Sequence, residues 1–164
     1  MASEALRILC FGNPLHGDDG FGPEVCRRLA ALPPPLSLPR GVAAYDAGVR
    51  GLDAAWLFAG CREVIVVDAM APGESPGRLR ELAPADVPAE PAAAGGHGAG
   101  LGALLAALGE LIGPPPPITV LAAEAAAIRP FSPGLSPPVA AAVDHAVARI
   151  LKRARGLAAG VRDA

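Results

Sequence analysis

The stretch EVIVVDA, residues 63–69, gives the strongest strand signal in the chain. It contains four consecutive β-branched residues, from Val64 to Val67, which favour an extended backbone. A strand that is apolar at every position is typical of one that is buried on both faces of a parallel sheet. The run ends in Asp68, so a carboxylate follows the clearest predicted strand of the chain.

Shorter apolar runs and helical patterns alternate on both sides of this strand. We expect further strands at 5–11, 41–47, 77–82 and 118–122, and helices at 22–32, 52–59, 101–112 and 139–157. A Gly-, Ala- and Pro-rich loop covers 84–100, and an irregular connector covers 124–138. The alternation predicts a three-layer α/β/α sandwich with a mostly parallel twisted sheet of about five strands. The 164 residues fit one domain, which we assign to 1–164.

The composition excludes several classes of function. The net charge is −2, from 14 basic and 16 acidic residues, and no basic stripe of the kind that binds nucleic acid is present. No apolar run reaches the roughly 18 residues that a membrane span needs, and no signal peptide is expected. Cys10, Cys26 and Cys61 form neither a metal-type pair nor a disulfide pattern, which favours a reducing, cytoplasmic location.

Side chains that can bind a metal follow the predicted strands. Asp18 and Asp19 come after the first strand, Asp68 ends the β-branched strand, and His97 lies in the Gly-rich loop. In parallel sheets, sites form at the carboxyl ends of the strands, where these side chains can meet. Two carboxylates and an imidazole suit Zn²⁺ or Ni²⁺ better than Ca²⁺ or Mg²⁺, and they leave coordination positions open. His16, beside the aspartates, is a further candidate ligand.

Each of these residues also has a structural interpretation. Asp18 and Asp19 can form a turn that places negative charge at a helix N-terminus. Asp68 can cap the turn after its strand, and His97 can be a surface residue. Burial of a carboxylate without a partner is unfavourable for the free energy of folding. A purely structural role is therefore hardest to accept for Asp68, which ends a buried strand. The residue types alone therefore leave open an α/β enzyme or a metal-binding protein.

The loop after the first strand also resembles a family motif. Residues 7–22 read RILCFGNPLHGDDGFG, which is similar to the pattern G-N-x-L-x-x-D-D/E-G-x-G of the endopeptidases that mature the large subunit of [NiFe] hydrogenases. The resemblance continues through DAGVRG at 46–51, VIVVDA at 64–69, His97 before a Leu-rich helix, and PGLSPPV at 133–139. It therefore extends along the whole chain.

The resemblance implies that Asp19, Asp68 and His97 are metal ligands, that Asp19 and Asp68 are catalytic, and that Asp18 orients the loop. The implied enzyme is an endopeptidase, aspartic-type or metal-assisted. It removes the C-terminal extension of the hydrogenase large-subunit precursor after nickel insertion. Nickel is then carried by the substrate and recognised at the carboxylate/His site, where zinc or cadmium can also bind. Alanine-rich helices add the expectation of a monomer or a weak homodimer.

Two other functions are compatible with parts of the same pattern. A non-catalytic nickel-binding chaperone of this fold would bind the precursor without cutting it. A nucleotide-binding α/β domain would use the first Gly-rich loop for phosphate. The Asp18 and Asp19 pair argues against that function, because two carboxylates repel phosphate unless a metal intervenes, and the motif G-x-x-x-x-G-K-S/T is absent.

Overall fold

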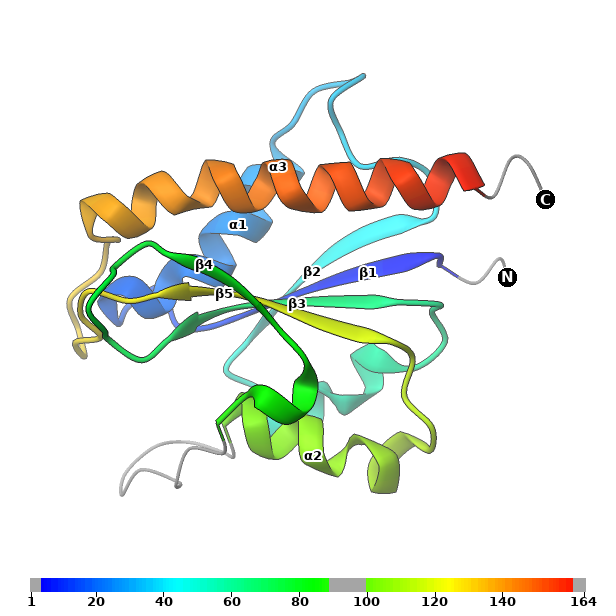
Figure 1. Ribbon diagram of the computed structural model, residues 1–164, viewed down its shortest axis with the longest axis horizontal. Coiled ribbons are helices and arrows are strands. Elements are labelled where there is room, and N and C mark those ends of the chain that lie inside the picture. Colours follow the sequence, from blue (N-terminus) through cyan, green and yellow to red (C-terminus); the bar gives the residue numbers. More distant parts are fainter. Residues whose placement is uncertain (1–3, 89–99, 161–164) are drawn as a thin grey trace.

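The sheet that the sequence predicts has five strands (Figure 1). The computed structural model describes residues 4–88 and 100–160. The strands are β1 (Leu6–Phe11), β2 (Val42–Gly48), β3 (Val64–Met70), β4 (Leu79–Leu82) and β5 (Ile118–Glu124), in the spatial order β2-β1-β3-β5-β4. All neighbours are parallel except β4, which runs antiparallel to β5 at the edge. The prediction of a mostly parallel α/β sheet is therefore confirmed.

The central position of β3 follows from its β-branched residues, which fill both sides of the sheet. Val64 and Val66 pack into the apolar core on one face, and Ile65 and Val67 pack into the core on the other. All four side chains are buried, as the unbroken apolar run predicts. Because β1 and β5 pair with β3 in parallel on either side, the carboxyl ends of these strands meet at one edge.

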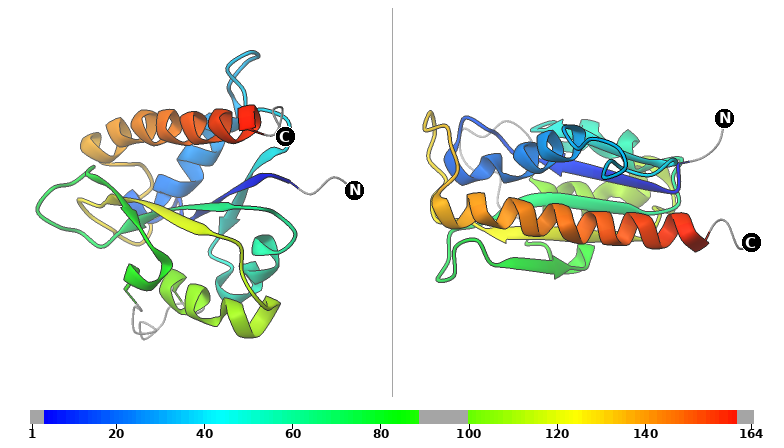
Figure 2. Two further views of the ribbon diagram at one scale, coloured as in Figure 1. Left: turned by 45° about the vertical axis from the view of Figure 1, so that its right-hand side comes forward. Right: turned by 90° about the horizontal axis from the view of Figure 1, so that it is seen from above.

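Helices cover both faces of the sheet (Figure 1 and Figure 2). Helices α1 (Phe21–Ala30) and α3 (Pro137–Gly160) cover one face, and α2 (Leu101–Ile112) covers the other with the 3-10 helix η2 (Gly51–Phe58). The three predicted layers are thus present. The residues at 52–59, where the spacing predicts a helix, form a 3-10 helix rather than an α-helix. Directly after this helix, the backbone N–H of Ala59 donates a hydrogen bond to the carbonyl of Trp56.

The segments predicted to be irregular are only partly described. Residues 84–100 begin with the short 3-10 helix η3 (Pro84–Asp86). The predicted ligand His97 falls within 89–99, outside the described residues. Residues 125–136 form an irregular connector between β5 and α3, as predicted. None of the helices in the described ranges is long and apolar enough to cross a membrane.

The turn from β1 into α1 brings backbone into very close contact with backbone. A methyl group at Gly22 would lie 2.0 Å from the carbonyl oxygen of Phe11 and 2.9 Å from that of Val67. Only glycine therefore lets the helix begin against the ends of β1 and β3. A methyl group at Gly12, whose φ is +129°, would lie 2.0 Å from the carbonyl oxygen of Asp19. The loop between these glycines is thus held against the carboxyl edge of the sheet.

Gly22→Ala is expected to lower the free energy of unfolding by at least about 3 kcal/mol, because the methyl group overlaps two carbonyl oxygens. Gly109 of α2 is the matched control, since a methyl group there meets no atom within 4 Å. Gly109→Ala should raise the free energy of unfolding by about 0.5–1 kcal/mol through helix propensity. Urea unfolding measures both changes, and an unchanged stability of Gly22→Ala would contradict this packing.

Candidate active site

The two predicted site aspartates lie at the carboxyl edge of the sheet, after neighbouring strands. Asp19 belongs to the 3-10 helix η1 (Gly17–Gly20), which follows β1 and packs against β3. Asp68 lies near the end of β3, in register with Ala122 of β5. Because β1 and β3 pair directly, both carboxylates belong to the same part of the edge. The structure therefore places these two residues where the sequence predicts a site.

The third predicted ligand, His97, lies outside the described residues, so the meeting of all three side chains stays a prediction. His16 does not take its place. Within the described part of the chain, no three His, Cys, Asp or Glu side chains are grouped closely enough to hold a metal ion. The His16 ring instead lies edge-on to Phe131, with ring centroids 6.1 Å apart and an interplanar angle of 67°.

Asp19 is half-buried beneath its own loop. Its Oδ2 atom accepts a hydrogen bond of 2.9 Å from the backbone N–H of Asn13. Burial raises the pKa of the Asp19 carboxyl above its ordinary value, although the Asn13 N–H and the nearby His16 act in the opposite direction. A raised carboxyl pKa at the carboxyl edge of a parallel sheet is typical of a functional group that exchanges a proton or binds a cation.

Asp68 is also half-buried, and its Oδ1 atom accepts a hydrogen bond of 2.8 Å from the backbone N–H of Ala69. The negative charge of Asp68 also affects a side chain of the neighbouring strand β1. The pKa of the Cys10 thiol is raised well above its ordinary value, chiefly by a hydrogen bond with Cys26 and by burial, and Asp68 adds a smaller electrostatic contribution. Asp68 is therefore an electrostatic neighbour of β1, the strand that leads into the loop at 12–20.

Asp18, directly before Asp19, has a contrasting environment. Its side chain is only 1% exposed, and it is the one buried charged side chain in the described ranges. Its carboxylate accepts four hydrogen bonds of 2.6–3.1 Å, from the backbone N–H groups of Ala126, Ala127 and Ser136 and from the Ser136 hydroxyl. Burial raises the pKa of Asp18, but these hydrogen bonds outweigh burial and hold the pKa below its ordinary value. Asp18 thus fixes the loop, which matches the role that the family resemblance implies.

The connector between β5 and α3 is the part of the site that sequence reasoning missed. It runs beside the loop at 12–20, where the backbone N–H of Asp18 donates to the carbonyl of Ala127 and that of Ser132 donates to the carbonyl of Leu15. Ser136 directly precedes α3, so the Asp18 carboxylate also stands at the positive end of that helix dipole. A serine directly before a helix predicts a helix cap. The sequence around Ser136 does not, however, indicate that its partner is Asp18, which lies far away in the chain.

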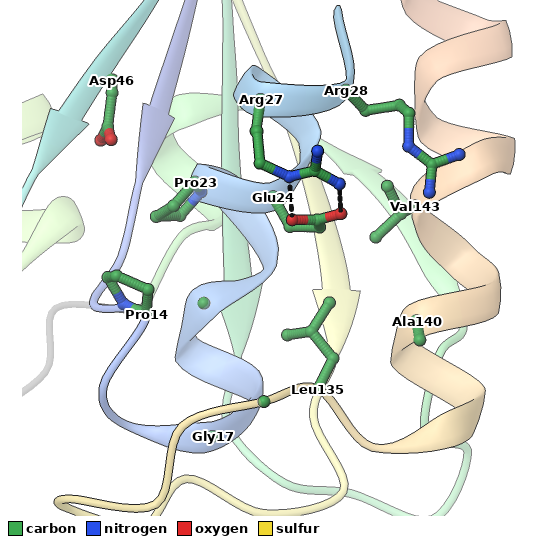
Figure 3. Close-up of a pocket in the computed structure, with 12 residues that line it drawn as sticks. Pro14, Gly17, Pro23, Glu24, Arg27, Arg28, Asp46, Leu135, Ala140 and Val143 are labelled. Atoms are coloured by element: carbon green, nitrogen blue, oxygen red, sulfur yellow. Dashed lines mark hydrogen bonds and ion pairs between the residues drawn. The ribbon is translucent and has the colours of Figure 1, made fainter. Parts of the chain in front are cut away.

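A groove of about 590 Å³ opens beside the loop at 12–20, between α1 and α3 (Figure 3). Its apolar wall consists of Pro14, Pro23, Leu135, Ala140 and Val143. On the α1 side, Arg27 donates hydrogen bonds of 2.6 and 2.8 Å to the carboxylate of Glu24. Neither Asp19 nor Asp68 lines this groove, so it adjoins the predicted site without containing it.

Fold and site together define a class of protein. A mostly parallel sheet with helices on both faces and half-buried carboxylates at its carboxyl edge is the arrangement of α/β enzymes whose functional groups follow the strands. Residues 27–153 match the family model described as hydrogenase maturation protease. The chain belongs to the hydrogenase maturation protease family, so the resemblance seen in the sequence is confirmed.

Individual relatives agree with this assignment. The hydrogenase expression/formation protein HupD of Rhodobacter capsulatus is 30% identical over 155 residues, which cover 93% of this chain and 72% of HupD. A hydrogenase 2 maturation peptidase from a Thaumarchaeota archaeon has 28% identity and a TM-score of 0.64, covering 91% of this chain and 97% of its own. The hydrogenase maturating endopeptidase HybD of E. coli has a TM-score of 0.72 and 24% identity over 93% of each chain, which supports the fold.

Asp18→Asn is expected to lower the free energy of unfolding at pH 7 by about 2–4 kcal/mol, because an amide cannot accept all the hydrogen bonds that the carboxylate accepts. The folded-state pKa of Asp18 lies below its unfolded value of about 3.9. The stabilisation is therefore present above about pH 4 and is lost as the pH falls through the folded-state pKa. Urea unfolding of both chains at pH values of about 7, 5 and 3 measures this.

The matched control is Asp53→Asn, which changes an exposed aspartate of η2 and should alter the free energy of unfolding by less than about 0.5 kcal/mol. The difference in stability between Asp18→Asn and the parent chain should shrink at the lowest pH. A difference that is as large at about pH 3 as at pH 7 would show that the charge on Asp18 does not stabilise the two loops.

Proposed function

We propose that this chain is the endopeptidase that removes the C-terminal extension from the large-subunit precursor of a [NiFe] hydrogenase after nickel insertion. The observation that carries the proposal is the pair of half-buried carboxylates, Asp19 and Asp68, at the carboxyl ends of adjacent strands in a chain of the hydrogenase maturation protease family. Paired carboxylates can activate water and bind a cation, which are the two abilities that this reaction needs.

Asp19, Asp68 and His97 recognise the nickel ion that the precursor carries. Carboxylate oxygen and imidazole nitrogen suit Ni²⁺, and zinc or cadmium ions can take the same place. Burial of Asp19 supports this role, because a bound cation offsets the loss of hydration that raises the pKa of its carboxyl. Three ligands from the protease leave the remaining positions of the nickel to the precursor, so cleavage depends on metal loading.

One of the two carboxylates acts as the general base for the attacking water. It takes a proton from the water while the water oxygen bonds to the carbonyl carbon of the scissile peptide. The proton then passes to the nitrogen of the departing C-terminal segment as the C–N bond breaks. The raised pKa of Asp19 favours it as the proton carrier, because its carboxyl holds a proton closer to neutral pH than an exposed aspartate does.

The partner in this proposal is the hydrogenase large-subunit precursor in the cytoplasm. Cys10, Cys26 and Cys61 are free thiols, the state that a reducing compartment maintains. A chaperone of the same fold would bind the same precursor and leave its C-terminus intact. The mass of the precursor before and after incubation with the chain distinguishes the two functions.

Asp19→Asn, Asp68→Asn and His97→Ala are each expected to slow processing of the nickel-loaded precursor at least about 100-fold, because each removes a metal ligand or a proton acceptor. Mass spectrometry of the precursor measures the rate. Glu110→Gln, which changes an exposed carboxylate near the C-terminal end of α2, where the chain returns to the start of β5, is the control and should process at the parent rate. Normal trimming by Asp68→Asn would show that the proposed site is wrong, and binding without any mass loss by the parent chain would favour the chaperone.

A precursor without nickel is expected to be trimmed at least about tenfold more slowly than the nickel-loaded form, because the metal contact contributes to binding at the cleavage site. The same mass measurement, made on both forms at equal concentration, gives the ratio of rates. A precursor whose C-terminal extension has already been removed serves as the mass standard. Equal trimming of both forms would leave the peptidase activity in place and contradict recognition of the metal.

A further inference from the structure

Phe131 in the connector between β5 and α3 has two unusual properties. It is 87% exposed, more than any other large apolar side chain in the described residues. Its φ is +55°, and among the described residues it is the one non-glycine residue with a positive φ. Bulky side chains avoid this backbone conformation, so both the exposure of the ring and the backbone are unfavourable for folding. The fold itself gives no reason for an aromatic residue at this position.

The position of Phe131 is nevertheless well defined, because the connector is attached to the loop that carries Asp19. The backbone N–H of Ser132 donates a hydrogen bond of 3.0 Å to the carbonyl of Leu15, and His16 forms a parallel bridge with Ser132. The Phe131 ring also lies edge-on to the His16 ring, with the ring centroids 6.1 Å apart. Phe131 therefore projects into solvent from a fixed place beside the candidate active site.

Other exposed apolar side chains accompany it on the same two segments. Leu15 is 54% exposed and Ile128 is 38% exposed. We call Leu15, Ile128 and Phe131 the rim surface. The segments that carry it follow β1 and β5 and lie together at the carboxyl end of the sheet, on the left in Figure 1. Arg129 lies between Ile128 and Phe131 in the chain, and no described carboxylate forms an ion pair with it.

We propose that the rim surface is where the folded hydrogenase precursor docks, with the Phe131 ring entering an apolar pocket on the precursor. The proposal rests on the proposed function and identifies the surface that recognises the substrate. An aromatic side chain has few rotatable bonds and therefore loses little entropy on binding, and such residues dominate the affinity of many interfaces. Arg129 adds a preference for a carboxylate at the border of that pocket.

The location of the rim surface selects the precursor over a second copy of this chain. Leu15 lies in the same short loop as Asp19, and the connector that carries Phe131 supplies the hydrogen bonds to Asp18. A second copy that covered this surface would also cover the edge where the carboxylates lie. A substrate docked on the same surface would instead bring its cleavage site to the carboxylates.

The decisive variant is Phe131→Gly, measured in steady-state trimming of the nickel-loaded precursor. Glycine removes the ring and adopts a positive φ freely, so the melting temperature should stay the same or rise. The KM for the precursor is expected to rise at least about tenfold, whereas kcat should stay within about twofold. Leu15→Ala, which leaves the His16 ring contact intact, should raise KM in the same direction.

The matched control is Trp56→Ala, which removes an aromatic side chain that is 73% exposed on η2. Trp56 lies at the opposite edge of the sheet, because the carbonyl of the nearby Ala59 accepts a hydrogen bond from Arg7 at the start of β1. Trp56→Ala should leave the KM for the precursor unchanged. An equal rise in KM for this variant would show that exposed aromatic residues in general, rather than the rim surface, affect binding.

Three results overturn the docking surface while the parent chain still trims the precursor. They are an unchanged KM for Phe131→Gly, a clear fall in its melting temperature, which would make the ring structural, and a concentration-dependent dimer of the parent chain that Phe131→Gly abolishes. In each case the proposed function stands. A parent chain that does not trim the nickel-loaded precursor overturns the proposed function and the docking surface together.

Discussion

The carboxylate of Asp18 is the contact on which the arrangement of the site depends. A buried charge loses its hydration, and such a charge is tolerated only where other groups replace the hydrogen bonds of water. Here three backbone N–H groups and one hydroxyl replace them, all from the connector before α3. The same contact joins the loop after β1 to the segment after β5, and it places a negative charge at the N-terminus of α3. Two loops that are distant in sequence thereby become one rigid unit over the carboxyl edge.

Neighbouring aspartates in this loop behave differently because their surroundings differ. Asp18 receives enough hydrogen bonds to keep its pKa low despite burial, whereas Asp19 receives one from Asn13 and its pKa is raised by burial. When two adjacent carboxyl groups have pKa values that differ because of their environments, they can have different roles. The group with the low pKa stays charged and serves the structure, and the group with the raised pKa can take part in proton transfer. This contrast supports the proposal that Asp19, rather than Asp18, binds the metal and takes part in catalysis.

The sequence predicts the sheet well because the signal is local. The four β-branched residues of β3 specify a strand buried on both faces, and its central position follows. The placement of Asp19 and Asp68 at one edge follows in turn from the parallel topology. The partners of Asp18 could not be predicted in this way, since Ala126 and Ser136 lie more than one hundred residues further along the chain. The 3-10 geometry of η2 was also hidden, because its apolar spacing resembles that of an α-helix.

The hydrogen bonds of Asp18 also bear on the proposed docking of the hydrogenase precursor at this edge. Binding energy can accelerate a reaction only if it is not consumed in ordering the enzyme. A mobile loop would lose entropy on docking, and the gain from contacts at Leu15 or Phe131 would be spent on that ordering. In the proposed function, the Asp18 carboxylate orders both segments before the precursor arrives, so contacts at the rim surface would position the scissile bond relative to Asp19. The buried charge of Asp18, which is unfavourable for an isolated side chain, would in this way favour precise placement of the precursor at the proposed catalytic carboxylates.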